Sequence, residues 1–154
     1  MEMPKPSEHH QKLRRLVGSW KGTEIMHPSQ WDPKGGEAMG STECALALGG
    51  FAIVSDYQQN RGGIVTYAGH GVWTCDQKTN EVVLHWFDSM GSPPEVFRGM
   101  WHGDALVVSH GGPGMHARLT YDFSRNGRLA SQMEMSSDGQ KWNTLFNGNY
   151  ELAK

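Results

Sequence analysis

Hydrophobic and polar residues alternate along most of the chain from residue 18 onward, a period typical of β-strands with one buried face. Glycine-rich turn signals separate the short apolar stretches at intervals of about 8–12 residues, as in a β-sandwich or β-barrel. The pattern predicts about ten strands, near residues 18–27, 36–48, 51–60, 64–76, 81–89, 95–102, 105–110, 115–124, 128–136 and 141–152. Several connections are short enough for hairpins, so consecutive strands should pair antiparallel. We expect an all-β, up-and-down barrel, because closure removes the exposed edges of such a long meander.

The stretch before residue 18 has a helical period instead. SEHHQKLRRLV (7–17) begins with Ser7, a good N-cap, and is followed by Gly18, which should end the helix. We expect residues 1–17 to form an N-terminal segment with a helix that caps one end, and residues 18–154 to form one barrel domain.

Alternation also predicts which side chains line the barrel. In the first strand the inward set is Trp20, Gly22, Glu24 and Met26. In the last two strands the inward set is Leu129, Ser131, Met133, Met135, Trp142, Thr144, Phe146 and Tyr150. A two-residue turn at 138–139 would place Met135 opposite Trp142 and Met133 opposite Thr144, in agreement with the alternation.

The segment 114–123 allows two interpretations. Its hydrophobic residues favour an inward set of Ala117, Leu119, Tyr121 and Phe123. A two-residue turn at 126–127 instead turns His116, Arg118 and Thr120 inward. We favour the turn-based register, which leaves a Leu-Tyr-Phe strip outside as a contact for a homodimer. A one-residue bulge at the turn would reverse this choice.

Long loops rich in glycine and proline gather at the end opposite the helix. They cover residues 26–36, 59–63, 88–95 and 109–115. Barrel mouths are common positions for binding pockets, and loops on a rigid scaffold often carry function. Trp31 either folds over this mouth as a flap or packs on the rim, and Asp88 lies beside it as a polar group.

Glu24 is the most informative inward residue. A carboxyl group inside a barrel must be paired, hydrated or protonated. We expect Arg118 to be its partner, as a structural ion pair, as an anchor for the polar group of a ligand, or as part of an acid–base pair. Trp20 should plug the helix end, with its indole N–H bonded.

Composition excludes several classes of function. Fourteen basic and sixteen acidic residues among 154 give a net charge of −2 without like-charge runs, so no nucleic-acid partner is expected. The start lacks a signal-peptide pattern, and the longest apolar run, ALALGGFAIV, is too short to span a bilayer. We therefore expect a cytoplasmic protein with no membrane partner.

The reactive side chains do not form recognisable catalytic or metal motifs. Cys44 and Cys75 are far apart and should be reduced, partly buried thiols. The eight histidines lack paired spacing, so no metal site is expected. No nucleophile-elbow, P-loop or dinucleotide motif is present, so the sequence does not favour an enzyme.

Several segments together resemble a known family. The G-x-W start at residues 18–20 is similar to that of calycin-type barrels: lipocalins, fatty-acid-binding proteins and nitrobindins. The more specific match is carried by EMPKPSEHHQKLRRLVGSWKG, MHPSQWDPKGG, LALGGFAIVSDY, GHGVWTCD, HWFDSMGSPPEVFRG, HARLTYD and MEMSSDGQKW. These segments resemble the uncharacterised bacterial family termed domain of unknown function 1579. The resemblance implies a calycin-like barrel and no assigned activity.

These observations favour noncovalent binding of a small, partly apolar molecule in the barrel. The expected ligand-binding residues are Glu24, Trp31, Asp88, His116, Arg118, Met133, Trp142 and Phe146. One alternative is a nitrobindin-like haem protein, although Glu24 and Met26 replace two glycines of the pattern in that group. A second is an enzyme that uses Glu24 and His116 as acid–base groups, and a third is a filled barrel that acts through dimerisation.

Overall fold

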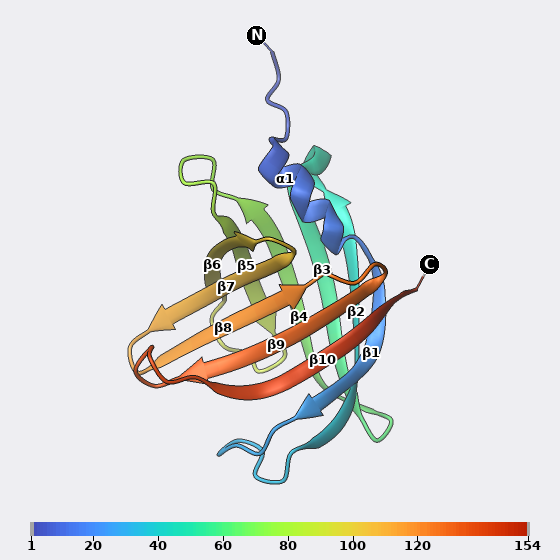
Figure 1. Cartoon of the computed structure of the whole chain (residues 1–154), viewed down its shortest axis with the longest axis vertical. Helices are drawn as coiled ribbons and strands as arrows, with labels where there is room; N and C mark the ends of the chain where they lie inside the picture. The colour runs from blue at the N-terminus through green and yellow to red at the C-terminus, as the bar shows by residue number, and fades with distance from the viewer. Residues whose placement is uncertain (1, 154) are drawn as a thin grey trace.

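Ten antiparallel strands close into a barrel in the computed structural model of the protein, which describes residues 2–153 (Figure 1). Each strand pairs with its neighbours in sequence, and the last strand pairs with the first. The strands are β1 (Gly18–Met26), β2 (Gly36–Ala47), β3 (Ala52–Arg61), β4 (Ile64–Cys75), β5 (Val82–Asp88), β6 (Glu95–His102), β7 (Ala105–Gly112), β8 (Met115–Asp122), β9 (Arg128–Ser136) and β10 (Asn143–Ala153). The predicted up-and-down barrel is confirmed.

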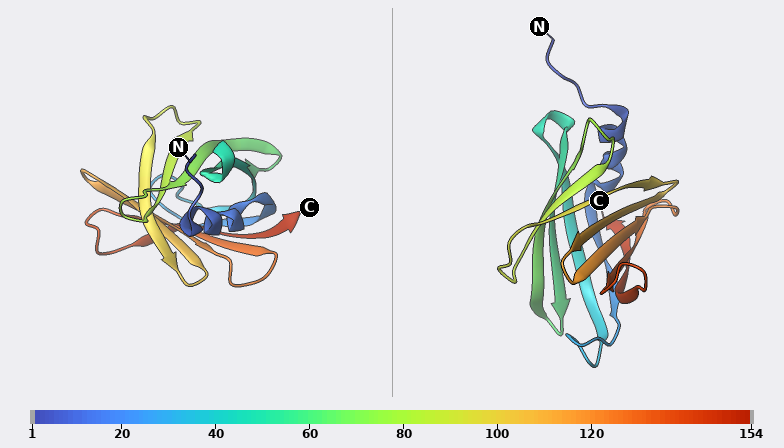
Figure 2. Two further views of the ribbon diagram at one scale, coloured as in Figure 1. Left: turned by 90° about the horizontal axis from the view of Figure 1, so that it is seen from above. Right: turned by 90° about the vertical axis from the view of Figure 1, so that its left-hand side faces the viewer.

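A short helical segment covers one end of the barrel, the closed end (Figure 2, left). It consists of α1 (Glu8–Lys12) and the 3-10 turn η1 (Leu13–Leu16); a second 3-10 turn, η2 (Leu48–Gly50), links β2 and β3. Ser7 caps α1 as predicted, in a reciprocal capping box with His10. Leu13 and Leu16 are buried against the barrel, and no helix within residues 2–153 is long and apolar enough to cross a membrane.

The closed half of the barrel is a packed apolar core. Trp20 from β1 is 3% exposed, and its Nε1 donates a hydrogen bond to the carbonyl oxygen of Leu16 at 2.9 Å. The indole also packs edge-on against Phe123. Trp20 therefore ties the helical cap to the barrel, and the opposite, open end is the one left for a cavity.

Strand β8 follows the hydrophobic pattern, so the turn-based register was wrong. Ala117 and Leu119 are buried, and Leu119 pairs with Met133. The last β8–β9 pair joins Asp122 to Ala130, one residue out of step with a two-residue turn at 126–127. The outer Leu-Tyr-Phe strip that suggested a dimer contact is therefore inside the barrel.

The second register prediction was also wrong, because Met135 pairs with Asn143 rather than Trp142, so the connection at 138–139 is longer than a two-residue turn, and a bulge in β10 then shifts the register again. Thr144 pairs with Glu134 and Phe146 pairs with Met133, so Leu145 is the extra residue. Because Leu145 has no partner on β9, the inward and outward positions of β10 are exchanged on the two sides of the bulge. Phe146 faces inward as predicted, whereas Thr144 and Trp142 lie on the outer side.

Both cysteines should resist alkylation in the folded protein. Cys44 and Cys75 are free and buried, and burial raises the pKa of each thiol to about 11. The reactive thiolate is scarce at pH 8 for such a group. Mass spectrometry after treatment with iodoacetamide should show an unmodified native protein and two additions in urea. Rapid addition to the native protein would contradict the buried positions.

Candidate functional site

A cavity of about 580 Å³ opens at the end of the barrel opposite the helix. Its wall is rich in aromatic and sulfur-containing side chains, and strands β1, β3 to β6 and β8 to β10 contribute to it. Prominent among them are Tyr67, Trp86, Phe97, Met133, Met135 and Phe146. Leu145 and Phe146, consecutive in sequence, both line it, which the β10 bulge makes possible. The open half of the barrel therefore holds a space that its own side chains do not fill.

A polar cluster, the polar floor, lies at the inner end of this cavity and consists of Glu24, Tyr57, Gln59, Ser131 and Tyr150. Glu24 is 0% exposed. Its Oε1 accepts hydrogen bonds from Tyr57 (2.9 Å) and Gln59 (3.1 Å), and its Oε2 accepts from Tyr57 (2.7 Å) and Tyr150. Three uncharged donors thus hold the carboxyl group, in place of the cation expected at Arg118.

Glycine makes room for this carboxyl group in the adjacent strand. Gly40 on β2 pairs with Gly22 on β1, two residues before Glu24. A Cβ atom at Gly40 would lie 2.6 Å from Cδ of Glu24 and 2.9 Å from a ring carbon of Tyr150. The bare backbone of Gly40 therefore lets Glu24 and Tyr150 meet at the floor.

The two phenols of the polar floor remain hydrogen-bond donors. Burial, with the neighbouring carboxyl group of Glu24 as a further cause, raises the pKa of Tyr57 and of Tyr150 well above the ordinary value of a tyrosine. Ser131 in turn donates to the phenol oxygen of Tyr150 at 3.3 Å. The floor is thus a connected network that ends on Glu24.

A second polar group lies higher on the wall. The hydroxyl of Tyr67 donates to Oδ2 of Asp88 at 2.8 Å, and Nε1 of Trp86 donates to the oxygen of Tyr67 at 3.0 Å. The ring of Trp86 covers Gly69, where an added Cβ would lie 2.7 Å from Cε2 of the indole. This chain fixes Asp88 at the rim through neighbouring strands β4 and β5.

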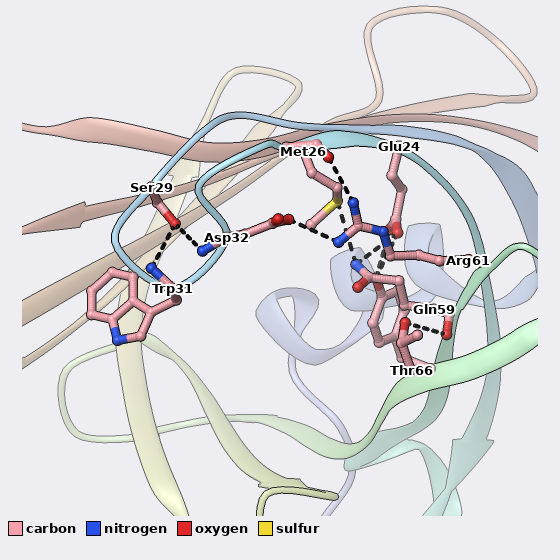
Figure 3. Close-up of polar contacts among 10 residues, drawn as sticks. Glu24, Met26, Ser29, Trp31, Asp32, Gln59, Arg61 and Thr66 are labelled. Carbon is pink, nitrogen blue, oxygen red and sulfur yellow. Dashed lines mark hydrogen bonds and ion pairs between the residues drawn. The ribbon is translucent and has the colours of Figure 1, made fainter.

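The loop between β1 and β2 covers part of the mouth (Figure 3). Oγ of Ser29 accepts from the backbone N–H groups of Trp31 (3.2 Å) and Asp32 (3.1 Å). Arg61 on β3 anchors the loop through Asp32 (2.8 Å) and the carbonyl oxygen of Gly35 (2.8 Å). Trp31 lines the cavity but is 59% exposed, so it stands at the mouth without being packed beneath other side chains.

Three of the predicted site residues lie outside the barrel. Arg118 forms a two-point ion pair with Glu134, at 2.9 and 3.0 Å, and its guanidinium group stacks over Trp142 at 4.1 Å. His116 meets the edge of the same indole. His116 and Glu24 therefore face opposite sides of the sheet and cannot act together on one ligand, which removes that acid–base pair.

The other predicted residues gather at the cavity. Trp31, Asp88, Met133 and Phe146 line it, and Glu24 belongs to the polar floor. A role for these five in ligand binding stays a prediction. The sequence reasoning did not select Tyr57, Gln59, Tyr67, Trp86 or Tyr150 as site residues. One signal could have identified Tyr57 and Gln59. Every second residue of β3 from Ser55 to Gln59 carries a polar group, and these residues face the inside of the barrel.

The wall does not fit a haem of the nitrobindin type. His27 is the one histidine that lines the cavity among residues 2–153, and its Nε2 lies 2.7 Å from Oδ1 of Asn147. Glu24 and Met26 also project where that pattern has glycine. Within the described residues no three His, Cys, Asp or Glu side chains are grouped to hold a metal ion.

Comparison with known proteins gives a family and a fold. The family described as Protein of unknown function (DUF1579) matches residues 5–151. The crystal structure of Rv2717c from M. tuberculosis is similar, with a TM-score of 0.70, 16% identity, and coverage of 96% of this chain and 99% of that one.

The S-type phycobiliprotein lyase CPES from Guillardia theta has a TM-score of 0.63 and 12% identity, over 98% of this chain and 99% of that one. A search of curated proteins found no match. At these identities the two structures establish a shared fold.

Proposed function

Because the chain belongs to the family described as Protein of unknown function (DUF1579), whose description assigns no activity, we propose its function from the cavity itself. The protein binds a small, partly apolar molecule noncovalently inside the barrel. The observation that carries this proposal is an open cavity of about 580 Å³ with an apolar wall and one polar floor. Ligand pockets have this size and this mixture of surfaces.

The arrangement of the wall supports this proposal. A barrel that serves only as a packed core would fill both halves with interlocking side chains, as the closed half does around Trp20. In the open half, aromatic rings and methionines surround an unfilled space instead, and methionine adapts to ligands of varied shape. The fold shared with a phycobiliprotein lyase supports the proposal at the level of architecture only.

The proposal predicts that a bulky residue on the wall will block binding. Met133 lines the cavity, whereas Ala130 lies on the exposed face of the same strand. N-Phenyl-1-naphthylamine, a neutral dye that fluoresces in apolar surroundings, should bind the native protein and the Ala130→Trp variant equally well. Met133→Trp should weaken binding about tenfold or more, corresponding to at least roughly 1.4 kcal/mol.

Circular dichroism of both variants serves as the control for folding. The proposal fails if the native protein does not bind the dye. It also fails if a folded Met133→Trp variant binds as well as Ala130→Trp, because the dye would then occupy another surface.

A further inference from the structure

The charged residues that line the cavity are acidic. They are Asp32, Asp88 and Glu95, and no lysine or arginine among residues 2–153 lines it. Arg61 balances Asp32 in an ion pair at 2.8 Å. Glu95 has only His110 at 3.9 Å, while Asp88 accepts hydrogen bonds from neutral donors. The cavity therefore carries negative charge that the protein itself does not balance.

Most hydrogen-bond donors of the inner wall already have partners within the protein, whereas the hydroxyl of Tyr121, which also lines the cavity, makes no hydrogen bond among the described residues. The hydroxyl groups of Tyr57 and Tyr150 donate to Glu24, and that of Tyr67 donates to Asp88. Nε1 of Trp86 donates to the oxygen of Tyr67. A ligand that needs to accept several hydrogen bonds would compete with these contacts, because only the Tyr121 hydroxyl among residues 2–153 is a free donor there, and that hydroxyl can equally accept a hydrogen bond from a ligand.

One strong acceptor is left open at the floor. The amide of Gln59 is oriented by Glu24, since only its NH₂ group can donate to that oxygen. Gln59 is 8% exposed and lines the cavity, and no hydrogen bond among the described residues uses its Oε1. Among residues 2–153, only one fully buried side-chain nitrogen or oxygen atom lacks a hydrogen-bond partner, and it is Nε1 of Trp101. Oε1 of Gln59 also lacks a partner, so it is not fully buried and is accessible from the cavity. A ligand group that donates a hydrogen bond would satisfy it.

The aromatic rings favour the same kind of ligand. The negative faces of Tyr and Trp rings attract a cation, and the attraction is strongest where water is excluded. The ring of Tyr57 lies 6.0 Å from that of Tyr67 and 6.3 Å from that of Trp86. All three rings line the cavity next to Gln59 and Asp88.

We infer that the cavity selects a small molecule with a protonated amine on a partly apolar body. The ammonium group donates to Oε1 of Gln59 and is attracted by the negative charge of Asp88, while the apolar body contacts the methionine and phenylalanine side chains above. This inference rests on the proposed function and adds the chemical class of the ligand.

Three probes with one apolar body test the inference. They are 1-naphthylmethylamine, which is an ammonium ion at pH 7, the neutral 1-naphthylmethanol, and the anion 1-naphthaleneacetate. Titration calorimetry on the full chain should show the ammonium probe binding about tenfold more tightly than the alcohol, equivalent to about 1.4 kcal/mol. The carboxylate should be the weakest of the three.

The outcomes separate this inference from the proposed function. If the alcohol binds as tightly as the amine, or the carboxylate binds best, the amine preference is wrong while binding in the cavity stands. If none of the three probes binds, and the neutral dye does not bind either, both proposals fail.

Removing the negative charge of Asp88 tests whether the preference for the ammonium probe arises in the cavity. Asp88→Asn should weaken the amine about three- to tenfold and leave the alcohol unchanged, because the attraction from a nearby charge is lost. Glu37→Gln removes the same charge from an exposed position on β2 and is the matched control. Equal losses in both variants would show that net protein charge, rather than the cavity, attracts the amine, and would overturn the inference.

Discussion

Replacing Trp20 with alanine should lower the free energy of unfolding by about 3–5 kcal/mol, as for other large aromatic residues removed from a core. Trp20 is 3% exposed, packs against Phe123, and holds the backbone of Leu16 through its indole N–H. The substitution leaves a cavity where the helical segment meets the barrel. It also leaves a carbonyl oxygen at the end of η1 without this donor.

Urea denaturation followed by circular dichroism measures this effect. Trp31→Ala is the matched control, because Trp31 is 59% exposed and should change the free energy of unfolding by less than about 0.5 kcal/mol, as other surface substitutions do. A loss below about 1 kcal/mol for Trp20→Ala, outside the range for large core side chains, would show that the cap does not depend on this side chain.

Replacing Glu24 with leucine should lower the free energy of unfolding by roughly 3 kcal/mol, because each buried donor left without an acceptor costs about 1–3 kcal/mol. Leucine keeps much of the volume but cannot accept hydrogen bonds from Tyr57, Gln59 and Tyr150. The backbone around Gly40 is too close for the floor to rearrange freely. Some of the loss can be recovered where a hydroxyl group turns toward the cavity.

A double-mutant cycle checks the cause of this loss. Tyr57→Phe should destabilise the native protein, yet cost much less in the Glu24→Leu background, where the hydroxyl group has lost its acceptor. Glu37→Leu, at an exposed position of β2, is the control for the change of charge. Additive costs of Glu24→Leu and Tyr57→Phe would show that the two side chains do not depend on each other.

The strand pattern and the inward face of β1 were predictable, because both depend on local alternation and turn residues. All ten strands lie close to their predicted ranges, and Trp20 and Glu24 face inward. The facing of β8 was also available from hydrophobicity alone. The connection at 126–127 is not a two-residue turn, so the turn residues pointed to the wrong face, whereas the apolar Ala117 and Leu119 pointed to the buried one.

The remaining errors came from features that alternation cannot reveal. A single extra residue, Leu145, moves Trp142 to the outside, and no local signal distinguishes a bulge from a regular strand. The partners of Glu24 come from β3 and β10, so they depend on which strands close the barrel. An arginine is the usual partner for a carboxyl group, whereas here three neutral donors on β3 and β10 fulfil that role.

The closure of the barrel between β1 and β10 determines when the site can form during synthesis. Glu24 and Tyr150 are 126 positions apart, so the floor is complete only after β10 has been made. Contacts this distant form slowly, because the loop between them must close first. A nascent chain that ends at β9 exposes two unpaired edges, β1 and β9, each able to join a strand of another molecule. The newly made protein thus depends on its final strand for protection from aggregation.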